Sequence, residues 1–401
     1  MRQDRFDTIV VGAGPIGAAT SRHLAEQGAD VLVVGPAEPA GFADHTGVWA
    51  GHYDQGRLAH VLEFPLVAGI LGNRSRRRFA ALQERTGIEF ALPVESVTVM
   101  PGGPLRDQGG TWFDLDRLKA NADDLNVEVH RLDEAELRRQ YPDLRFEPAH
   151  AALVQRDALI VNPRALTRAE LAAACAAGAR LVRDEIVSVR DVGGGADVTS
   201  RSGATWSARS VVLATGAASN VTGLLPRPLA MDTFGATVVL VEVAGPTAVR
   251  LPALMYMKVR GSKALYGGIV MQPLLYPDGK WYVKCAGSSV LDTPLRSAED
   301  IARWVRTGGR QDDLAEALAL LTELVPGKEF GPARTRPCLV SANHSGAPYI
   351  DHVDENIVIA VEGERGAMAA DEIGRLAARL VADGQWTDSI PGQIFRARWA
   401  D

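Results

Sequence analysis

The residues best suited to chemistry stand at the front of the chain, where positions 6–17 carry the sequence FDTIVVGAGPIG. In such a segment Gly12 permits a tight turn out of a strand, Gly14 lets the backbone approach a pyrophosphate, and Gly17 lets a helix pack closely on the strand. The start of that helix offers unpaired N–H groups and a positive dipole end. The pattern therefore predicts an adenine dinucleotide site whose contacts are Gly12, Gly14, Pro15, Ile16 and Gly17.

A strand, a helix and a second strand must position these glycines, and the flanking residues supply them. An apolar strand precedes the glycines, the amphipathic stretch 18–27 follows, and Val31–Val34 forms the second strand. An ordinary glycine-rich turn is the alternative interpretation. The second strand should end in an acid that holds the adenosine ribose, but Gly35 stands there and Glu38 is the nearest acid.

The composition is typical of a soluble globular chain. Its 401 residues are 46% apolar and 23% charged, and the chain is long enough to form two hydrophobic cores. The net charge of -6 argues against binding to nucleic acid or to a membrane through a polybasic surface. The basic cluster Arg74–Arg78 is interpreted as a solvated helix end. Three cysteines, Cys175, Cys285 and Cys338, form no disulfide framework or metal-ligand pair, which favours a reducing compartment. Without a cleavable apolar leader or an 18-residue apolar run, we expect a cytoplasmic protein with no membrane or metal partner.

The rest of the chain predicts an α/β fold with a strand-rich insertion. Residues 35–56 lack periodicity and are expected to form a long loop at the cofactor's edge. Helical spacing covers Leu66–Thr86, and residues 298–324 form another helical segment. The apolar strand 210–214 runs into Thr215 and Gly216, a small-residue turn that can face a nucleotide. Residues 232–291 read as an antiparallel meander.

The end of the chain repeats the pattern of its beginning, with strand Ile357–Val361, a glycine turn and a helix over 369–383. We therefore infer a nucleotide domain assembled from the start, middle and end of the chain. A second domain is inserted twice.

This order of segments resembles the D-amino-acid oxidase (DAO) superfamily of flavoproteins, specifically its monomeric sarcosine oxidase and N-methyltryptophan oxidase branch. The segments that carry the resemblance are the GAGPIG turn, His45-Thr46-Gly47, Val161–Leu166, Val211–Gly216 and the block Cys338–Gly374. It implies a Rossmann-like FAD-binding domain of the GR2/DAO type (1–75, 150–228 and 333–401). An inserted α+β substrate domain built on an antiparallel sheet would take 76–149 and 229–332.

The resemblance also implies FAD as the cofactor. Beyond the first turn, it assigns FAD contacts to Glu38, His45, Thr46, Gly47, Thr215, Gly216, Cys338, Gly363, Arg365, Gly366, Ala367 and Met368. In this branch the cysteine at the position of Cys338 carries FAD covalently, through its sulfur and the 8α-methyl group. A small buried apolar role is the alternative for Cys338, and His45 is a second conceivable attachment residue.

Lys284 falls where the branch keeps a lysine that activates oxygen, because a fixed cation beside the flavin stabilises superoxide. Its alternative is a lysine whose charged end reaches solvent from a half-exposed sheet. Tyr266 matches the branch's tyrosine beside the substrate. By strand alternation Tyr282 and Lys284 face one way, and Val283 faces the other.

The sequence departs from this branch at positions that bind the substrate. Where small-amino-acid oxidases hold the carboxylate with an arginine and a lysine, this chain has Trp49 or His52, and Ala369 or Ala370. Ser288 stands at the position of a histidine. A carboxylate buried without charged partners is costly, which argues against a small sarcosine-like zwitterion.

Trp49 and His52 instead suggest a bulkier pocket wall, although packing of the loop explains them equally well. Arg57 and Arg365 are alternative partners for an anionic group, or solvated loop arginines. The predicted catalytic set is Lys284, Tyr266, His45, Trp49, His52 and Arg365.

These inferences predict an FAD-dependent oxidase of a C–N bond that converts an amine to an imine and O2 to hydrogen peroxide, as a monomer or small homo-oligomer. The cofactor performs the redox step, so no hydrolytic triad or metal is needed. The alternatives are an FAD dehydrogenase with another acceptor, a nicotinamide-dependent dehydrogenase, a flavin hydroxylase and a non-catalytic flavoprotein.

Overall fold

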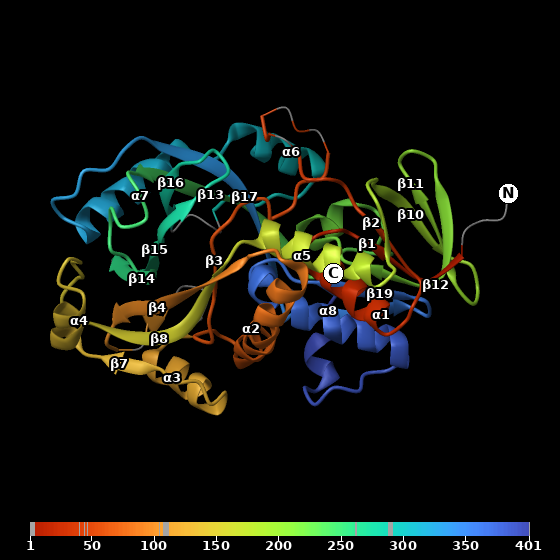
Figure 1. Cartoon of the computed structure of the whole chain (residues 1–401), viewed down its shortest axis with the longest axis horizontal. Helices are drawn as coiled ribbons and strands as arrows, with labels where there is room; N and C mark the ends of the chain where they lie inside the picture. The colour runs from red at the N-terminus through yellow and green to blue at the C-terminus, as the bar shows by residue number, and fades with distance from the viewer. Residues whose placement is uncertain are drawn as a thin grey trace.

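Two sheets organise the protein, as the computed structural model shows (Figure 1). The structure describes residues 5–39, 41–43, 45, 47–103, 105–106, 112–260, 263–287 and 292–400. Side chains are described for these residues except 105–106, 112–113, 259–260 and 263–267.

The first sheet has the strand order β10-β11-β12-β1-β2-β9, with β19 also paired to β12 and β18 paired to β19. Its strands are β1 (Arg5–Val11), β2 (Val31–Val34), β9 (Arg180–Val182), β10 (Ile186–Asp191), β11 (Ala196–Ser200), β12 (Thr205–Leu213), β18 (Tyr349–Asp354) and β19 (Ile357–Val361). The pairs β1–β12, β1–β2, β2–β9 and β12–β19 are parallel. The start, middle and end of the chain therefore meet in one parallel layer, as the repeated strand-turn-helix pattern predicts.

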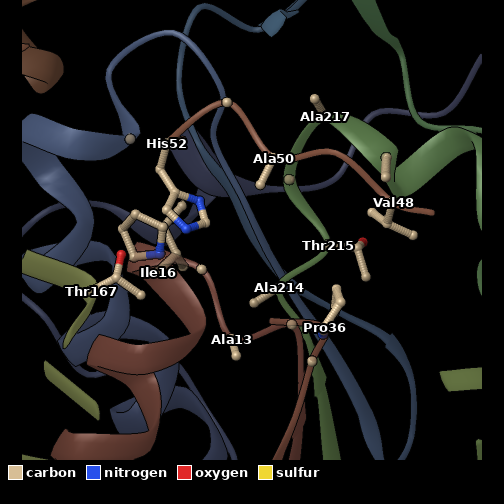
Figure 2. A pocket seen from close by; sticks show the side chains of 18 of the residues that line it. Ala13, Ile16, Pro36, Val48, Ala50, His52, Thr167, Ala214, Thr215 and Ala217 are labelled. Carbon is tan, nitrogen blue, oxygen red and sulfur yellow. The ribbon is translucent and has the colours of Figure 1, made fainter. Parts of the chain in front are cut away.

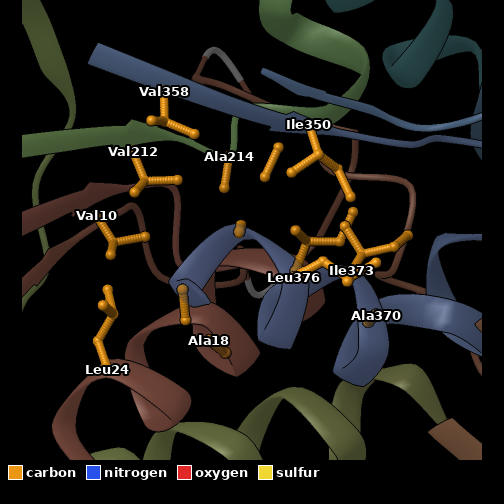
Figure 3. Close-up of a cluster of buried hydrophobic side chains, with 14 of the residues drawn as sticks. Val10, Ala18, Leu24, Val212, Ala214, Ile350, Val358, Ala370, Ile373 and Leu376 are labelled. Carbon is orange, nitrogen blue, oxygen red and sulfur yellow. The ribbon is translucent and has the colours of Figure 1, made fainter. Parts of the chain in front are cut away.

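Four helices accompany this layer: α1 (Pro15–Glu26), α2 (Leu66–Thr86), α5 (Pro163–Ala176) and α8 (Gly366–Asp383). Figure 3 shows α1 and α8 under the parallel strands, where Val10, Val212 and Val358 meet Leu24 and Leu376. Gly374 permits this contact, because a Cβ there would lie 2.6 Å from both the Ala19 Cβ and the Thr20 N. The core of this layer thus holds the first turns of two helices in fixed positions beside each other.

The second sheet is mostly antiparallel, in the order β17-β13-β16-β15-β14-β4-β8-β3, with β7 on β8. Its strands are β3 (Arg57–Ala59), β4 (Ala91–Pro101), β7 (His130–Leu132), β8 (His150–Val161), β13 (Met231–Val243), β14 (Ala253–Arg260), β15 (Lys263–Leu275), β16 (Trp281–Ala286) and β17 (Ala333–Asn343). The remaining elements are β5 (Leu105–Arg106), β6 (Trp112–Phe113), α3 (Leu115–Asp124), α4 (Glu134–Gln140), α6 (Ala298–Thr307), α7 (Gln311–Leu324), and the short 3-10 helices η1 (Gly216–Val221) and η2 (Gly392–Phe395). The predicted antiparallel sheet over 232–291 is confirmed, but it is a meander only from β14 to β16, because β13 pairs with β16 and not with β14.

One predicted helix is in fact two. The helical spacing over 298–324 is interrupted between α6 and α7, where Gly308 and Gly309 have φ angles of 76° and 103°. Left-handed glycines end helices because they alone adopt this conformation without strain.

The sheets divide the chain differently from the predicted domain ranges. Strands β3, β8 and β17 belong to the second sheet, although the predicted ranges 1–75, 150–228 and 333–401 give them to the FAD-binding domain. Their backbones hydrogen-bond to substrate-domain strands, since β17 pairs with β13 and β8 with β4. The division into two domains remains a proposal, and these strands link the two layers.

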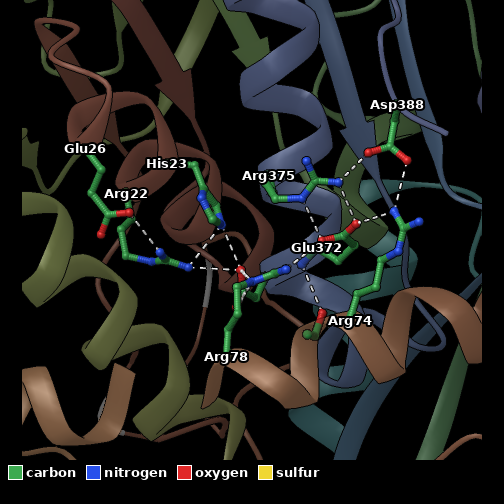
Figure 4. A network of polar contacts seen from close by, with 10 residues as sticks. Arg22, His23, Glu26, Arg74, Arg78, Glu372, Arg375 and Asp388 are labelled. Atoms are coloured by element: carbon green, nitrogen blue, oxygen red, sulfur yellow. Dashed lines mark hydrogen bonds and ion pairs between the residues drawn. The ribbon is translucent and has the colours of Figure 1, made fainter. Parts of the chain in front are cut away.

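A buried network of charges joins the four helices of the first layer (Figure 4). Asp371 on α8 accepts hydrogen bonds from Arg22 (3.0 Å), His23 (2.8 Å) and Arg78 (3.1 Å), and Arg22 also contacts Glu170 on α5. On the same helix, the neighbouring carboxylate of Glu372 pairs with Arg74, Arg78 and Arg375.

The interpretation of Arg74–Arg78 as a solvated helix end is therefore wrong for Arg74 and Arg78. Both side chains pair with carboxylates of α8 that have no solvent exposure. Within the described residues, no helix has both the length and the apolar character needed to cross a membrane.

Candidate active site

A cavity of about 320 Å³ opens at the carboxyl ends of the parallel strands. Figure 2 shows how it is walled by the first glycine turn, the end of β2, the loop around His52 and the turn at Thr215. The predicted site residues that line it are Gly12, Gly14, Pro15, Ile16, Glu38, Trp49, His52, Thr215, Gly216, Gly363, Gly366 and Ala367. Residues from both glycine turns thus face one space.

The first glycine turn leaves no room for side chains. Gly12 has a φ of 110°, and a Cβ there would lie 2.3 Å from the Ala214 O. A Cβ on Gly17 would lie 1.8 Å from the Gly12 O. Helix α1 begins at Pro15 with Gly14 as its N-cap, so its first N–H groups have no partner within the helix and face the cavity end of the turn.

The missing acid at the end of β2 has a steric cause. A Cβ on Gly35 would lie 2.4 Å from the Ala13 N, so no acidic side chain fits there. Glu38 lines the cavity instead and pairs with Arg164 at 2.6 Å. Glu38 therefore lies at the end of the cavity that is expected to hold adenosine, and Arg164 balances its charge.

His52 lies on the cofactor side of the cavity. Its Nδ1 and Cε1 are 3.6 Å from the position of a Cβ on Gly14, and Figure 2 shows the ring beside Ile16. Burial lowers the pKa of His52 to about 3, helped by the charges of Arg164 and Arg57, so its imidazole is neutral. The loop thus folds His52 over the glycine turn, and its role as a wall of the substrate pocket stays a prediction.

The neighbouring aromatic residues pack the loop. Trp49 is buried and meets Tyr53 and His45 edge to face, each with ring centroids 5.1 Å apart. His45 does not line the cavity, and among the described residues its buried Nε2 has no hydrogen-bond partner. Gly47 is exposed beside His45, while Thr46 lies outside the described residues.

The second glycine turn is held by a carboxylate. Glu362 Oε1 accepts hydrogen bonds from the N–H groups of Gly363 (3.2 Å), Glu364 (3.0 Å) and Arg365 (3.1 Å), and burial raises the pKa of Glu362. Gly366 and Ala367 begin α8 and line the cavity, and first-turn N–H groups have no acceptor within a helix.

Arg365 and Met368, both predicted to contact the cofactor, do not line this cavity. The Arg365 guanidinium is bound to Glu63 (2.7 Å), Glu364 (2.8 Å) and the Phe64 carbonyl (2.9 Å). Met368 is buried in an apolar cluster against Gly72.

Cys338 and Lys284 lie close together in a second group of buried residues. The Cys338 thiol receives a hydrogen bond from Arg57 Nη2 at 3.2 Å, and Arg57 Nη1 pairs with Asp54 at 3.0 Å. Asp54 also pairs with Lys284 at 2.8 Å and accepts from the Tyr276 hydroxyl at 3.2 Å. Arg57 lines the cavity, so this group reaches it through the guanidinium.

The charges of this group depend on one another. Burial, with the like charge of Arg57, lowers the pKa of Lys284 to about 8 despite the attraction of Asp54. Although burial opposes it, the charges of Lys284 and Arg57 hold the pKa of Asp54 down at about 2. Lys284 is only 3% exposed, which excludes a charged end in solvent.

Tyr266 is described only by its backbone, which pairs with Met257 between β14 and β15. Ser288 lies outside the described residues. Among the residues that the structure describes, no three His, Cys, Asp or Glu side chains gather as a metal site would require.

The residues present fit FAD. Two glycine turns present helix N-termini to one cavity. FAD needs such N–H groups at its pyrophosphate and at the polar edge of its flavin ring. Sequence reasoning missed Asp54, Tyr276 and Glu362. A carboxylate directly before a Gly-x-x-Gly turn was a usable signal for Glu362, but nothing in the aperiodic loop distinguished Asp54.

Comparisons with known proteins agree with this geometry. The family model described as FAD dependent oxidoreductase (DAO) matches residues 7–380. Monomeric sarcosine oxidase of Streptomyces avermitilis is 27% identical over 180 residues, which cover 45% of this chain and 44% of that protein. A probable electron transfer flavoprotein-quinone oxidoreductase of Escherichia coli is 35% identical over 94 residues, covering 22% of this chain and 20% of its own. The chain thus matches less than half the length of either curated relative.

Solved structures share the fold over nearly the whole chain. NikD, titled an unusual amino acid oxidase essential for nikkomycin biosynthesis, has a TM-score of 0.77 and 19% identity, covering 99% of this chain and 98% of its own. Glycine oxidase from Geobacillus kaustophilus has a TM-score of 0.70 and 20% identity, covering 98% of each chain.

Proposed function

The chain belongs to the family of FAD-dependent oxidoreductases, and on this premise we propose that it oxidises a C–N bond of an amine or amino-acid derivative, with O2 as the electron acceptor. Bound FAD supplies the redox chemistry, accepting the equivalent of a hydride from the carbon next to nitrogen. The chain's own residues then have three tasks, which are to hold the cofactor, to keep the amine neutral and to provide charge for the reaction with oxygen.

Cofactor binding falls to the two glycine turns. The first-turn N–H groups of α1 would hold the pyrophosphate, Glu38 would hold the ribose, and the N–H groups of Gly366 and Ala367 would hold the flavin end. Neutral His52, over Gly14, is placed to donate a hydrogen bond to the same pyrophosphate. Cys338 is proposed as the covalent attachment point.

The observation that carries the proposal is the surplus of positive charge beside Cys338. Arg57 and Lys284 share the single carboxylate of Asp54, and all three side chains are held within hydrogen-bond distance. A buried unbalanced cation attracts an anion, and superoxide formed from O2 is such an anion. The same charge disfavours an ammonium ion nearby, so it keeps a bound amine in the neutral form that is oxidised.

The proposed substrate is not a small sarcosine-like zwitterion. Ala369 and Ala370 are buried inside α8, and their methyl side chains offer no charged group to a carboxylate. A larger or less polar amine suits these side chains better.

Anaerobic mixing of the purified protein with a panel of amines tests this function. We expect bulky secondary or cyclic amines to bleach the flavin absorbance and sarcosine to leave it unchanged, followed by recovery and hydrogen peroxide release when air is admitted. Recovery with a quinone but not with O2 would assign the protein to the dehydrogenases. Failure of every amine to bleach the flavin would contradict the proposal.

Replacing Lys284 with methionine removes the charge while keeping an unbranched apolar stem. We expect reoxidation of the reduced flavin by O2 to slow roughly 10²–10³-fold, the usual cost of losing one preorganised electrostatic group. Anaerobic reduction by substrate should change little. Stopped-flow absorbance measures both steps, with Lys280→Met, an exposed lysine on the same hairpin, as the control. An unchanged oxidation rate would reject this role for Lys284.

A further inference from the structure

The carboxylate of Asp54 is the shared partner of Lys284, Arg57 and Tyr276. Its Oδ2 contacts Lys284 Nζ at 2.8 Å and Arg57 Nη1 at 3.0 Å, and its Oδ1 accepts from the Tyr276 hydroxyl at 3.2 Å. Asp54 comes from the aperiodic loop before β3, whereas Lys284 stands in the middle of β16. One side chain therefore ties the loop that walls the cavity to the second sheet.

All three donors of the Lys284 ammonium are in use. Besides Asp54, it donates to the backbone carbonyls of Gln55 at 3.1 Å and Gly56 at 2.7 Å. The ammonium group thus has a single fixed position and acts on its surroundings through charge, not through a free N–H. Its charge, in turn, depends on Asp54, the only anion within hydrogen-bond reach in the part of the chain that the structure describes.

Among the titratable groups packed around Lys284, Asp54 is the one that decides whether the lysine keeps its proton. Arg57 at the start of β3 is a like charge, and burial raises the pKa of Tyr276, directly after β15, well above its usual value, so that hydroxyl is neutral. Cys285, next to Lys284 on β16, has its pKa raised to about 12 by burial. The remaining neighbour is the Cys338 thiol on β17, which contacts Arg57.

We propose that Asp54 is a positioning residue for oxygen reactivity, which keeps Lys284 charged and fixed between the cofactor loop and β16. This inference rests on the proposed role of Lys284. An adjacent opposite charge shifts a pKa by roughly 1–3 units. Without Asp54, burial and Arg57 act on Lys284 unopposed, and the ammonium loses its proton near neutral pH.

The test is the pH profile of flavin reoxidation. The flavin is first reduced with dithionite, which makes the measurement independent of the substrate, and is then mixed with O2 between pH 6 and 9. The wild-type rate should fall above pH 8, the approximate pKa of Lys284. For Asp54→Asn the midpoint should move to roughly 6, so that the rate at pH 7.5 is at least about tenfold lower and recovers on acidification.

Matched variants separate charge from structure. Asp54→Ser removes the same charge with a smaller side chain and should show the same shift, whereas Asp54→Glu keeps the charge and should keep a midpoint near that of wild type. Asp278→Asn, an acid in the turn before β16 that pairs with Arg334, should leave the profile unchanged. Lys284→Met should be slow at every pH, because acid cannot restore its charge.

A second readout does not involve oxygen. In Asp54→Asn, Lys284 would be neutral in the folded chain but charged in the unfolded chain from about pH 6 to 10, so stability should rise with pH across that window. The double variant Asp54→Asn/Lys284→Met should lack this slope in thermal unfolding.

The outcomes distinguish the two proposals. If Lys284→Met reoxidises at the wild-type rate, its oxygen role fails, while the unfolding slope still tests the hold of Asp54 on Lys284. A slow Lys284→Met beside an Asp54→Asn protein with the wild-type profile would overturn the role of Asp54. Equal unfolding slopes in the single and double variants would also overturn it.

Discussion

Serine in place of Cys338 is expected to release all of the FAD when the protein is denatured, whereas the flavin of the wild-type protein should stay with the chain. Serine is nearly isosteric with cysteine, but its hydroxyl does not form the thioether. Separation of the acid-denatured chain from the supernatant, followed by absorbance of each fraction, measures the effect directly.

Cys285→Ser is the matched control for this prediction. Cys285 and Cys338 are both buried and lie on strands that pair with β13, but they face different clusters. Only Cys338 contacts the cavity-lining Arg57, at 3.2 Å. The Cys285 variant should therefore retain its flavin on denaturation.

Two results would contradict the attachment at Cys338. Release of FAD from the denatured wild-type protein would show that the flavin is not covalent at all. Retention of FAD by the Cys338→Ser chain would transfer the attachment to another residue. His45, whose buried Nε2 has no partner among the described residues, is then the first to substitute.

Local signals were sufficient to predict the elements that frame the site. The spacing of apolar residues predicted α2 with both ends correct, because Gly87 in the left-handed conformation terminates it wherever the helix packs. The glycine fingerprint likewise predicted the start of α1, since steric contacts with Gly12 O and Ala214 O leave glycine as the only residue that fits. These outcomes depend on residues close in sequence or on a fixed motif.

Side-chain directions within loops could not be predicted in this way. The sequence did not indicate that His52 lies over Gly14 or that Arg365 is bound to Glu63. Both directions are set by where a loop meets elements distant in sequence. Asp54 was not predicted for the same reason, because its partners Lys284 and Tyr276 are distant in sequence, on β16 and directly after β15.

Asparagine in place of Asp371 is expected to produce the largest loss of stability among conservative changes in this protein. Asp371 is fully buried and pairs with Arg22, His23 and Arg78. A neutral amide would leave the buried guanidinium of Arg22 and the half-buried guanidinium of Arg78 without this counter-charge. Breaking one side of such a pair typically costs about 3–5 kcal/mol. Thermal and urea unfolding should both show the loss.

Asp383→Asn is the control, because Asp383 ends the same helix but its contacts are exposed or half-exposed, an ion pair with Arg379 at 3.7 Å and a hydrogen bond from the Thr387 hydroxyl at 2.6 Å. Exposed pairs contribute about 0–1 kcal/mol. Although burial opposes it, the positive groups around Asp371 lower its pKa to about 2, so its charge stabilises the fold above its unfolded pKa near 4. The difference between wild type and Asp371→Asn should therefore be constant at neutral pH and shrink as the pH falls from about 4 to 2.

The position of Asp371 gives this loss a functional consequence. Through Arg22 it joins α8 to α1, the two helices whose first turns face the cofactor cavity, and Gly374 brings those helices into direct contact. In the Cys338→Ser background, where FAD is held without a covalent bond, Asp371→Asn should weaken FAD binding, measured as the dissociation constant by flavin fluorescence. Equal FAD affinity with and without Asp371, despite the loss of stability, would show that the helix starts are positioned by apolar packing alone.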